Sequence, residues 1–300
     1  MTTIGVVGLG SMGAAIAGRL LDGGTDHDGE TEVYGTNRTK AKADALIQQG
    51  LKWRDTPRAV ASAAQVTISM VTDDAALTAI TEGPDGILAG LRPRSVYIEM
   101  STVSPRASQE LAARARAAGA VMVDAPVSGS VPTARGGTLA IMVGGTTAGF
   151  QAAKPVLRQL GDVTYVGGNG QGLLLKLAVN VSLAAQMLAF SEGILLAERG
   201  GIDPSVAAKV LTGSAIGSPM LQARAPLVLD LPDQPWFDVR LLHKDIRLAR
   251  EAARQEGVPL PSATAAEVVL RRAEELGYGH RDIAGLFEVL AKMSPGPGGT

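Results

Sequence analysis

The sequence predicts an α/β fold: a doubly wound parallel sheet in the N-terminal part, followed by an all-helical C-terminal part. A glycine-rich turn over residues 8–13 directly follows the first apolar strand pattern. From there, short β-branched strand patterns alternate with helical patterns as far as residue 166, which is typical of a parallel sheet. After Gly167–Gly170 the strand patterns stop and helical patterns fill the chain. We therefore expect an α/β domain over residues 1–166 and a helical domain over residues 167–300.

The composition is that of a chain able to bury a substantial core. Hydrophobic residues make up 46% of the 300 residues and charged residues 19%, which is enough for one large domain or two ordinary ones. The 37 glycines favour an α/β protein with many tight turns between strands and helices. Because the chain has no cysteine, disulfides, thiolate catalysis and a cysteine-based zinc site are excluded.

Charge and targeting patterns exclude further classes of protein. The net charge is −1 with acidic and basic residues interspersed, so we expect no nucleic-acid partner. The three histidines, His27, His243 and His280, lie far apart in the sequence, and we expect no metal site. No apolar run preceded by a basic region marks a signal peptide, so we expect a soluble, cytoplasmic protein that does not enter a membrane.

The first strand pattern, Thr3–Val7, leads into a GxGxxG motif, and Ala14–Leu21 then follows as a helix pattern. In this context Gly8 makes the tight turn, Gly10 lets the backbone approach a pyrophosphate, and Gly13 lets the helix pack close to the strand. The phosphates are expected at the helix N-terminus, as in a Rossmann dinucleotide-binding domain. The predicted contacts are Gly8, Leu9, Gly10, Ser11, Met12 and Gly13.

The end of the second strand, Glu32–Thr36, distinguishes the two nicotinamide cofactors. An NAD site usually places an acid there, whereas this chain has Asn37-Arg38-Thr39-Lys40. A guanidinium with nearby hydroxyl and amide donors suits a 2′-phosphate, so we favour NADP, with NAD possible. The alternative is that Arg38 and Lys40 are the solvated start of the next helix. The preceding segment Asp22–Thr31 is expected to be a solvated turn.

Further strand patterns end in loops rich in small polar residues. In a parallel sheet, ligands bind beyond the carboxyl ends of the strands, where these loops lie. Backbone amides around Ser128 and Gly129 suit a carboxylate, although an ordinary turn is the alternative interpretation. The strand patterns are Gln65–Val71, Ser95–Met100, Val121–Ala125 and Leu139–Val143, with a helix over Asp73–Ile80, and the loops are Val71-Thr72-Asp73, Ser101–Pro105 and Asp124–Ser130.

A long apolar segment begins at Gly170 and runs to about Arg199 without proline. Its apolar residues occupy almost every face of a helix, which predicts a buried helix. Lys176 and Asn180 are four residues apart and so share one face. Burying an ammonium group is costly unless it is paired or used, so this pair is a candidate site. The alternative is that Lys176 extends to solvent from the helix end.

Helical patterns complete the chain. One small α/β domain would not cover the long apolar helix, so we expect a homodimer or tetramer formed through the helical domain. Candidates for lining the substrate pocket are Leu173, Ile216, Met220 and Trp236. The helix patterns are Gly149–Leu160, before a strand at Asp162–Val166, then a start at Asp203-Pro204, Trp236–Gln255, Pro261–Leu276 and Arg281–Met293, followed by a frayed tail from Ser294.

Four stretches, in this order, resemble the motifs of the β-hydroxyacid dehydrogenase family, which includes 3-hydroxyisobutyrate dehydrogenase and glyoxylate/succinic semialdehyde reductase. The resemblance covers essentially the whole chain. The Asn37-Arg38-Thr39 ending is similar to the NADP-preferring reductase branch. The four stretches are Gly8–Gly13, Asp124–Gly129 continuing through Gly136–Leu139, Gly170–Asn180, and Phe237 with His243-Lys244-Asp245.

This resemblance implies an NAD(P)-dependent enzyme that acts on a small carboxylate-bearing substrate. It implies that Lys176 is the general acid that protonates the carbonyl oxygen, and that Asn180 holds the substrate and helps to place the lysine. It also implies that Ser128 and Gly129 bind the substrate carboxylate and that Thr102 lies near the nicotinamide ribose and the substrate.

The same resemblance implies that Lys244 closes over the cofactor and that Asp245 supports the substrate site. No metal is required. The implied cofactor contacts are Gly8, Leu9, Gly10, Ser11, Met12, Gly13, Asn37, Arg38, Thr39, Val71, Thr72, Thr102 and Lys244.

Physical chemistry agrees with an acid role for Lys176. A free lysine, with a pKa of about 10.4, is a poor acid near neutral pH. Desolvation on an apolar helix and the positive charge of an oxidised nicotinamide would lower that pKa. One departure is Val179, which stands where the family often has the first of two asparagines.

Two other functions remain alternatives. An imine reductase shares the glycine motif, the Asn37-Arg38-Thr39 ending and a helical domain, but such enzymes generally lack the lysine and the Asp124–Gly129 motif. A non-catalytic nucleotide-binding module is disfavoured because Lys176 is retained. A short 6-phosphogluconate dehydrogenase is disfavoured because a His-Asn pair is missing after the lysine.

Overall fold

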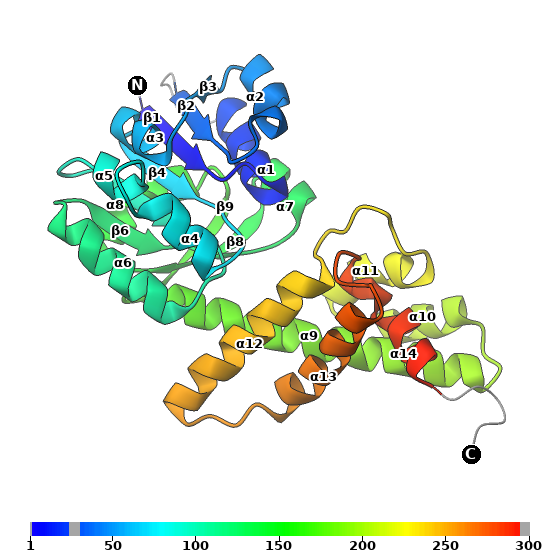
Figure 1. Cartoon of the computed structure of the whole chain (residues 1–300). Helices are drawn as coiled ribbons and strands as arrows, with labels where there is room; N and C mark the ends of the chain where they lie inside the picture. The colour runs from blue at the N-terminus through cyan, green and yellow to red at the C-terminus, as the bar shows by residue number, and fades with distance from the viewer. Residues whose placement is uncertain (1, 24–30, 295–300) are drawn as a thin grey trace. The chain divides into compact units, whose positions relative to one another are not determined.

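The computed structural model describes residues 2–23 and 31–294 (Figure 1). Most of the predicted Asp22–Thr31 turn and of the predicted C-terminal tail therefore lies outside the described residues. The chain divides into two compact units, Met1–Lys176 and Leu177–Thr300. The division falls inside the long helix α9 (Gln171–Arg199), and the predicted domain boundary at residue 166 stays a prediction.

The described part of the first unit contains a nine-stranded sheet in the order β3-β2-β1-β4-β5-β6-β8-β7, with β9 beside β8. Strands β1 to β6 pair in parallel, as expected for the doubly wound parallel sheet that was predicted. Strand β8 is antiparallel to β6 and β7, a reversal that the alternation of patterns does not reveal. The strands are β1 Thr2–Val7, β2 Thr31–Thr36, β3 Lys52–Trp53, β4 Val66–Ser69, β5 Val96–Glu99, β6 Val121–Asp124, β7 Val127–Ser128, β8 Leu139–Gly144 and β9 Gly161–Gly167.

Two hydrophobic clusters line the sheet, one with α1, α2, α7 and α8 and the other with α3 to α6. Several of these helices begin at a capping side chain: Thr56, Asp73, Ser104 and Thr146 each accept a backbone N–H of the first turn. The helices are α1 Ser11–Leu21, the 3-10 helix η1 Lys40–Ala43, α2 Asp44–Gln48, α3 Pro57–Ala63, α4 Asp74–Thr81, α5 Ile87–Gly90, α6 Pro105–Ala117, α7 Val131–Gly136 and α8 Thr147–Leu157.

The second unit is helical, as predicted. Its core joins side chains of α9 with those of α11 to α14, and α12 packs along α13. The remaining elements are α10 Pro204–Gly213, α11 Pro219–Leu229, α12 Val239–Glu256, α13 Pro261–Glu275, the 3-10 helix η2 Ile283–Gly285 and α14 Leu286–Met293.

A buried ion pair joins distant segments of the second unit. Asp282, with no exposed surface, accepts a hydrogen bond from Arg224 Nη1 at 2.6 Å. Its other carboxylate oxygen accepts the backbone N–H groups of Trp236 at 2.8 Å and Phe237 at 3.1 Å. One carboxylate therefore holds the segment before α12 against α11 and η2.

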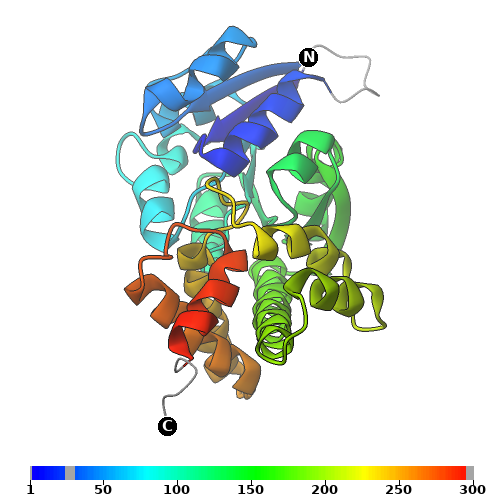
Figure 2. The same ribbon diagram turned by 90° about the vertical axis from the view of Figure 1, so that its right-hand side faces the viewer.

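Helix α9, seen nearly along its axis in Figure 2, is not buried on all sides within this chain. Leu174 and Leu175 are 40% and 41% exposed and Leu196 is 77% exposed, so the single chain leaves part of this apolar helix uncovered, and its burial against a second subunit stays a prediction. By length and composition α9 would suffice to cross a bilayer. Its opposite side, with Met187 and Ile194, forms the core of the second unit, which is the pattern of a core helix.

Candidate active site

The glycine turn between β1 and α1 has the shape that a dinucleotide pyrophosphate needs. Gly8 has φ of +94°, and a Cβ there would collide with the carbonyl oxygen of Met70. A Cβ at Gly13 would collide with the carbonyl oxygen of Gly8, whereas one at Gly10 would meet nothing within 4 Å. Gly10 is the N-cap of α1 and provides no side-chain cap. The N-terminus of α1 therefore offers open space beside Gly10 and the N–H groups of its first turn, which together suit an anionic group.

The loop after β2 is fastened to the glycine turn through Asn37. Its Oδ1 accepts the Leu9 N–H at 3.1 Å and its Nδ2 donates to the Thr39 carbonyl at 3.0 Å. Asn37 therefore braces the loop, a role that the sequence pattern did not predict. Arg38 and Thr39 are exposed beside it, where their side chains can meet a phosphate.

A hydrogen-bonded chain joins the loops after β4 and β5. The Val71 N–H donates to Ser101 Oγ at 2.8 Å, and the Ser101 N–H donates to Glu99 Oε1 at 2.7 Å. Ser101 and Glu99 have no exposed surface, and Thr102 next to them is half-buried. Sequence reasoning missed these two supports, although a glutamate ending an apolar strand is a usable signal.

The loop predicted to bind a carboxylate contains regular secondary structure and is not a simple turn. Ser128 belongs to the short strand β7 and pairs with Ala140 of β8. Gly129 is exposed with φ of +148°, and a Cβ there would lie 2.5 Å from Thr133 Oγ1. That same hydroxyl accepts the Ser130 N–H at 2.7 Å, which fixes the start of α7.

Lys176 is half-buried near the start of α9, and this helix start is held by Asp124 at the end of β6. The Asp124 carboxylate accepts the N–H of Gly170 at 2.7 Å and that of Leu173 at 3.2 Å. Burial raises the pKa of Asp124 to about 6, although these N–H donors act in the opposite direction. The Leu173 side chain is fully buried in the core of the first unit, so its prediction as a pocket residue is wrong.

The second unit brings together three of the predicted residues. Asn180 is fully buried and its Nδ2 donates to Asp245 Oδ2 at 2.6 Å. The ammonium group of Lys244 lies 2.9 Å from Asp245 Oδ1. Asp245 is only 2% exposed and thus orients an amide and an ammonium group at once.

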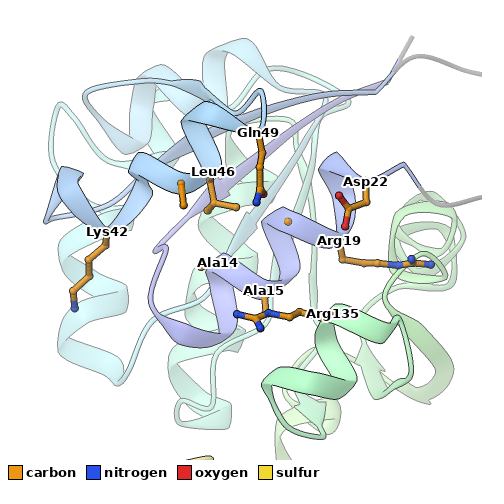
Figure 3. Close-up of a pocket in the computed structure, with 10 residues that line it drawn as sticks. Ala14, Ala15, Arg19, Asp22, Lys42, Leu46, Gln49 and Arg135 are labelled. Atoms are coloured by element: carbon orange, nitrogen blue, oxygen red, sulfur yellow. The ribbon is translucent and has the colours of Figure 1, made fainter. Parts of the chain in front are cut away.

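A separate pocket lies between α1, α2 and α7 (Figure 3). Its basic side chains, Arg19, Lys42 and Arg135, point in different directions, and Arg19 Nε donates to the Gln159 carbonyl at 3.1 Å. None of the predicted site residues lines it. Within residues 2–23 and 31–294, no three His, Asp or Glu side chains are grouped to hold a metal ion.

Comparison with known proteins confirms the family that the sequence resembles. A family model described as the NAD binding domain of 6-phosphogluconate dehydrogenase matches residues 3–168. One described as the NAD-binding of NADP-dependent 3-hydroxyisobutyrate dehydrogenase matches residues 170–290. The chain is similar to the chloroplastic glyoxylate/succinic semialdehyde reductase 2 of Arabidopsis thaliana, being 31% identical over 289 residues, 96% of this chain and 79% of that protein.

Solved structures with the same fold were also found. One named Psf3 in complex with NADP+ and 2-OPP has a TM-score of 0.87 at 28% identity, over 96% of this chain and 99% of that chain. An imine reductase from Pseudomonas sp. has a TM-score of 0.62 at 23% identity, over 96% and 99%, which is a likeness of fold alone. Since the first family model covers more than half of the chain and the plant relative spans nearly all of it, the chain belongs to the β-hydroxyacid dehydrogenase family of NAD(P)-dependent oxidoreductases.

Proposed function

We propose that this chain is an NADP-dependent oxidoreductase that transfers a hydride between the nicotinamide and a small β-hydroxy acid or carboxylate-bearing aldehyde, with Lys176 as general acid and base. One observation carries the proposal. The helix that bears Lys176 starts on the carboxylate of Asp124, at the end of the strand that leads directly to Ser128 and Gly129. Within one unit, a proton donor and an anion-binding loop thus share a single anchor.

The cofactor preference rests on the loop after β2. Arg38 and Thr39 are exposed there, and Asn37 holds them beside the glycine turn. A guanidinium and a hydroxyl suit the 2′-phosphate of NADP, and no acid follows β2 to bind a ribose hydroxyl in its place. The NADP+ in the Psf3 structure supports the same preference.

The bound nicotinamide would supply the hydride. Lys176 holds a proton at Nζ and gives it to the carbonyl oxygen during reduction, and it takes that proton back during oxidation. Ser128 and Gly129 bind the substrate carboxylate, with Thr102 beside it. Asn180, oriented by its hydrogen bond to Asp245, holds the substrate one helical turn beyond the lysine.

Lys244 and the exposed apolar side chains of the second unit are also given roles in the proposal. Lys244 closes over the cofactor and is itself held by Asp245 at 2.9 Å. We further propose that the protein is a homodimer or tetramer joined through the helical domain, because the apolar side chains of Leu196, Val210 and Ile216 are 77%, 63% and 70% exposed in the single chain.

The test is oxidation of NADPH and of NADH with glyoxylate, succinic semialdehyde and methylmalonate semialdehyde as substrates. The native chain is expected to turn over one of them with NADPH. Lys176→Ala is expected to lose about 10²- to 10⁴-fold in kcat, the usual contribution of a general acid, while still binding NADPH. The control Lys209→Ala removes an exposed lysine of α10 and is expected to keep native kinetics.

Reduction of a cyclic imine in place of every aldehyde would overturn this proposal in favour of an imine reductase. NADPH binding without turnover of any substrate would favour a non-catalytic module. Retention of Lys176 and of the Asp124–Gly129 motif speaks against both alternatives.

A further inference from the structure

The carboxylate of Asp124 is a helix cap supplied from a distant part of the chain. Its Oδ1 accepts the N–H of Gly170, 46 residues later, at 2.7 Å, and its Oδ2 accepts the N–H of Leu173 at 3.2 Å. These are orphan donors at the start of α9, which no local side chain of the glycine-rich joint satisfies. The partial positive charge at a helix N-terminus favours a carboxylate in this position.

Glycines on both sides leave the room that this carboxylate needs. A Cβ at Gly144 of β8 would lie 2.6 Å from Asp124 Oδ2, and one at Gly172 of α9 would lie 2.7 Å from the same oxygen. A Cβ at Gly172 would also lie 2.5 Å from the carbonyl oxygen of Met142. The first turn of α9 therefore packs backbone against backbone on β8, with the carboxylate enclosed between them.

Other contacts tie the same joint to the sheet. Asn169 Nδ2 donates to the Met122 carbonyl of β6 at 3.1 Å, and Gln109 Nε2 of α6 donates to the Asn169 carbonyl at 3.2 Å. The Leu173 side chain is fully buried among the core residues of the first unit. Lys176 follows three residues later, so the position of its Cα is set by these anchors.

We propose that Asp124 is a positioning residue for the reaction: it fixes the height and rotation of the lysine-bearing helix relative to the loop that carries Ser128 and Gly129. Asp124 is the last residue of β6, and the chain continues from it to Ser128 within four residues. A single carboxylate thus sets both the proton donor and the anion-binding loop. This inference rests on the proposed function, since it assumes that Lys176 is the acid.

An ordinary N-cap is a residue next to the helix that it caps, and its side chain is exposed. Asp203, the N-cap of α10, lies in exposed surroundings and accepts the N–H of its near neighbour Ser205 at 2.7 Å. Asp124 is instead fully buried, where ionisation is penalised and its pKa rises to about 6. A carboxylate held where its ionisation is penalised is expected of a residue that serves the arrangement of the site more than stability.

The test compares Asp124→Asn with the control Asp203→Asn. The asparagine would keep the shape of the aspartate but only one acceptor oxygen, so one of the two N–H groups would face an amide donor. We expect kcat to fall at least about tenfold in Asp124→Asn, because misplacement of a catalytic group by about 1 Å costs up to about 100-fold. The dissociation constant of NADPH is expected to stay within about twofold, since the glycine turn is untouched.

A second measurement needs no substrate. Competitive labelling with acetic anhydride across pH of about 6 to 10, read by mass spectrometry, reports the reactivity of the Lys176 amine against Lys209 as internal reference. We expect the pH profile of Lys176 to shift in Asp124→Asn and to stay native in Asp203→Asn. Asp124→Asn is expected to melt at a lower temperature than the native chain, because one of its two acceptor oxygens is lost. Asp203→Asn is expected to melt near the native temperature, because asparagine caps a helix about as well as aspartate does.

Two results would overturn the proposal. In one, Asp124→Asn melts at a lower temperature but keeps native kcat and native labelling of Lys176, which would make Asp124 a cap and nothing more. In the other, this isosteric variant does not fold at all, which would assign Asp124 to folding. If the native chain reduces no aldehyde, the proposed function fails, while the labelling result still decides whether Asp124 positions Lys176.

Discussion

Asp124, Asp245 and Asp282 are carboxylates with at most 2% of their surface exposed, and each fixes a segment far away in the sequence. Their partners lie 46, 65 and 46 residues distant, at Gly170, Asn180 and Trp236 respectively. Sequence reasoning identified Lys176 and Asn180 as a pair because four-residue spacing is a local pattern. It could not identify what orients them, since contacts over such separations leave no periodic trace.

The cofactor preference can be tested at Arg38. Arg38→Ala is expected to weaken binding of NADPH by about 10- to 100-fold, because a charge-assisted hydrogen bond to the 2′-phosphate is lost. Binding of NADH, which lacks that phosphate, is expected to stay within about twofold. Fluorescence titration measures the dissociation constants of NADPH and NADH. The control is Arg158→Ala, which removes an exposed arginine of the same unit. Equal losses for NADPH and NADH would show that Arg38 does not read the phosphate.

Asp124 also predicts how stability depends on pH. Its pKa is raised to about 6 in the folded chain, so between pH about 4 and 6 the folded state holds more protons than the unfolded state. The contribution of this titration to the free energy of unfolding is therefore fully present below pH about 4. It is lost as the pH rises through about 6, and the loss is at most about 3 kcal/mol. Thermal unfolding of native chain and Asp124→Asn should show the native advantage shrinking over this range. A native advantage that grows with pH would contradict the sign.

At the scale of helices and strands, the periodicity of apolar residues and the length of each element determined which elements the sequence could predict. Strands β1, β2, β4, β5, β6, β8 and β9 were predicted to within about two residues, because each is a β-branched run next to a glycine or polar turn. Strands β3 and β7, of two residues each, are too short to show the alternation of a strand, and helix α3, of seven residues, is too short to show a helical period, so these three elements were not predicted. The apolar pattern of α9 does not reveal what covers each face of the helix, so its burial against a second subunit stays a prediction.

The close packing of α9 on β8 gives a prediction for one helix. Gly172→Ala places a Cβ 2.5 Å from the Met142 carbonyl and 2.9 Å from the Gly144 nitrogen, so it is expected to lower stability by about 1–3 kcal/mol. Gly193→Ala, in the same helix, meets Leu211 Cδ1 at 3.4 Å and is expected to be neutral or stabilising by up to about 1 kcal/mol. Chemical denaturation measures the free energy of unfolding of both variants. Similar losses for Gly172→Ala and Gly193→Ala would show that the packing of α9 on β8 does not require Gly172.

At the scale of the whole molecule, the second unit exposes several large apolar side chains. Leu196, Ile202, Val206, Val210 and Ile216 are each at least 50% exposed, and they follow one another from the end of α9 to the segment after α10. Because large exposed apolar side chains mark association sites, we expect this surface to meet a second copy of the chain.

Size-exclusion chromatography with light scattering measures this directly. The native chain is expected to elute at a multiple of its monomer mass at micromolar concentration. The double variant Leu196→Glu with Val210→Glu is expected to shift to the monomer, because two buried carboxylates would be desolvated at the interface. Gln255→Glu adds a charge at an exposed position of α12 and should not change the mass. A native chain that is monomeric under these conditions would rule out the association.

The ion pair between Arg224 and Asp282 has a consequence for how this family varies. Losing either partner alone leaves a buried charge, which typically costs about 3–5 kcal/mol. Losing Asp282 also frees the backbone N–H groups of Trp236 and Phe237. Replacing both members of the pair with apolar side chains avoids the stranded charge. The two positions should therefore change together among homologues: an alignment should show the arginine and the aspartate either both kept or both gone.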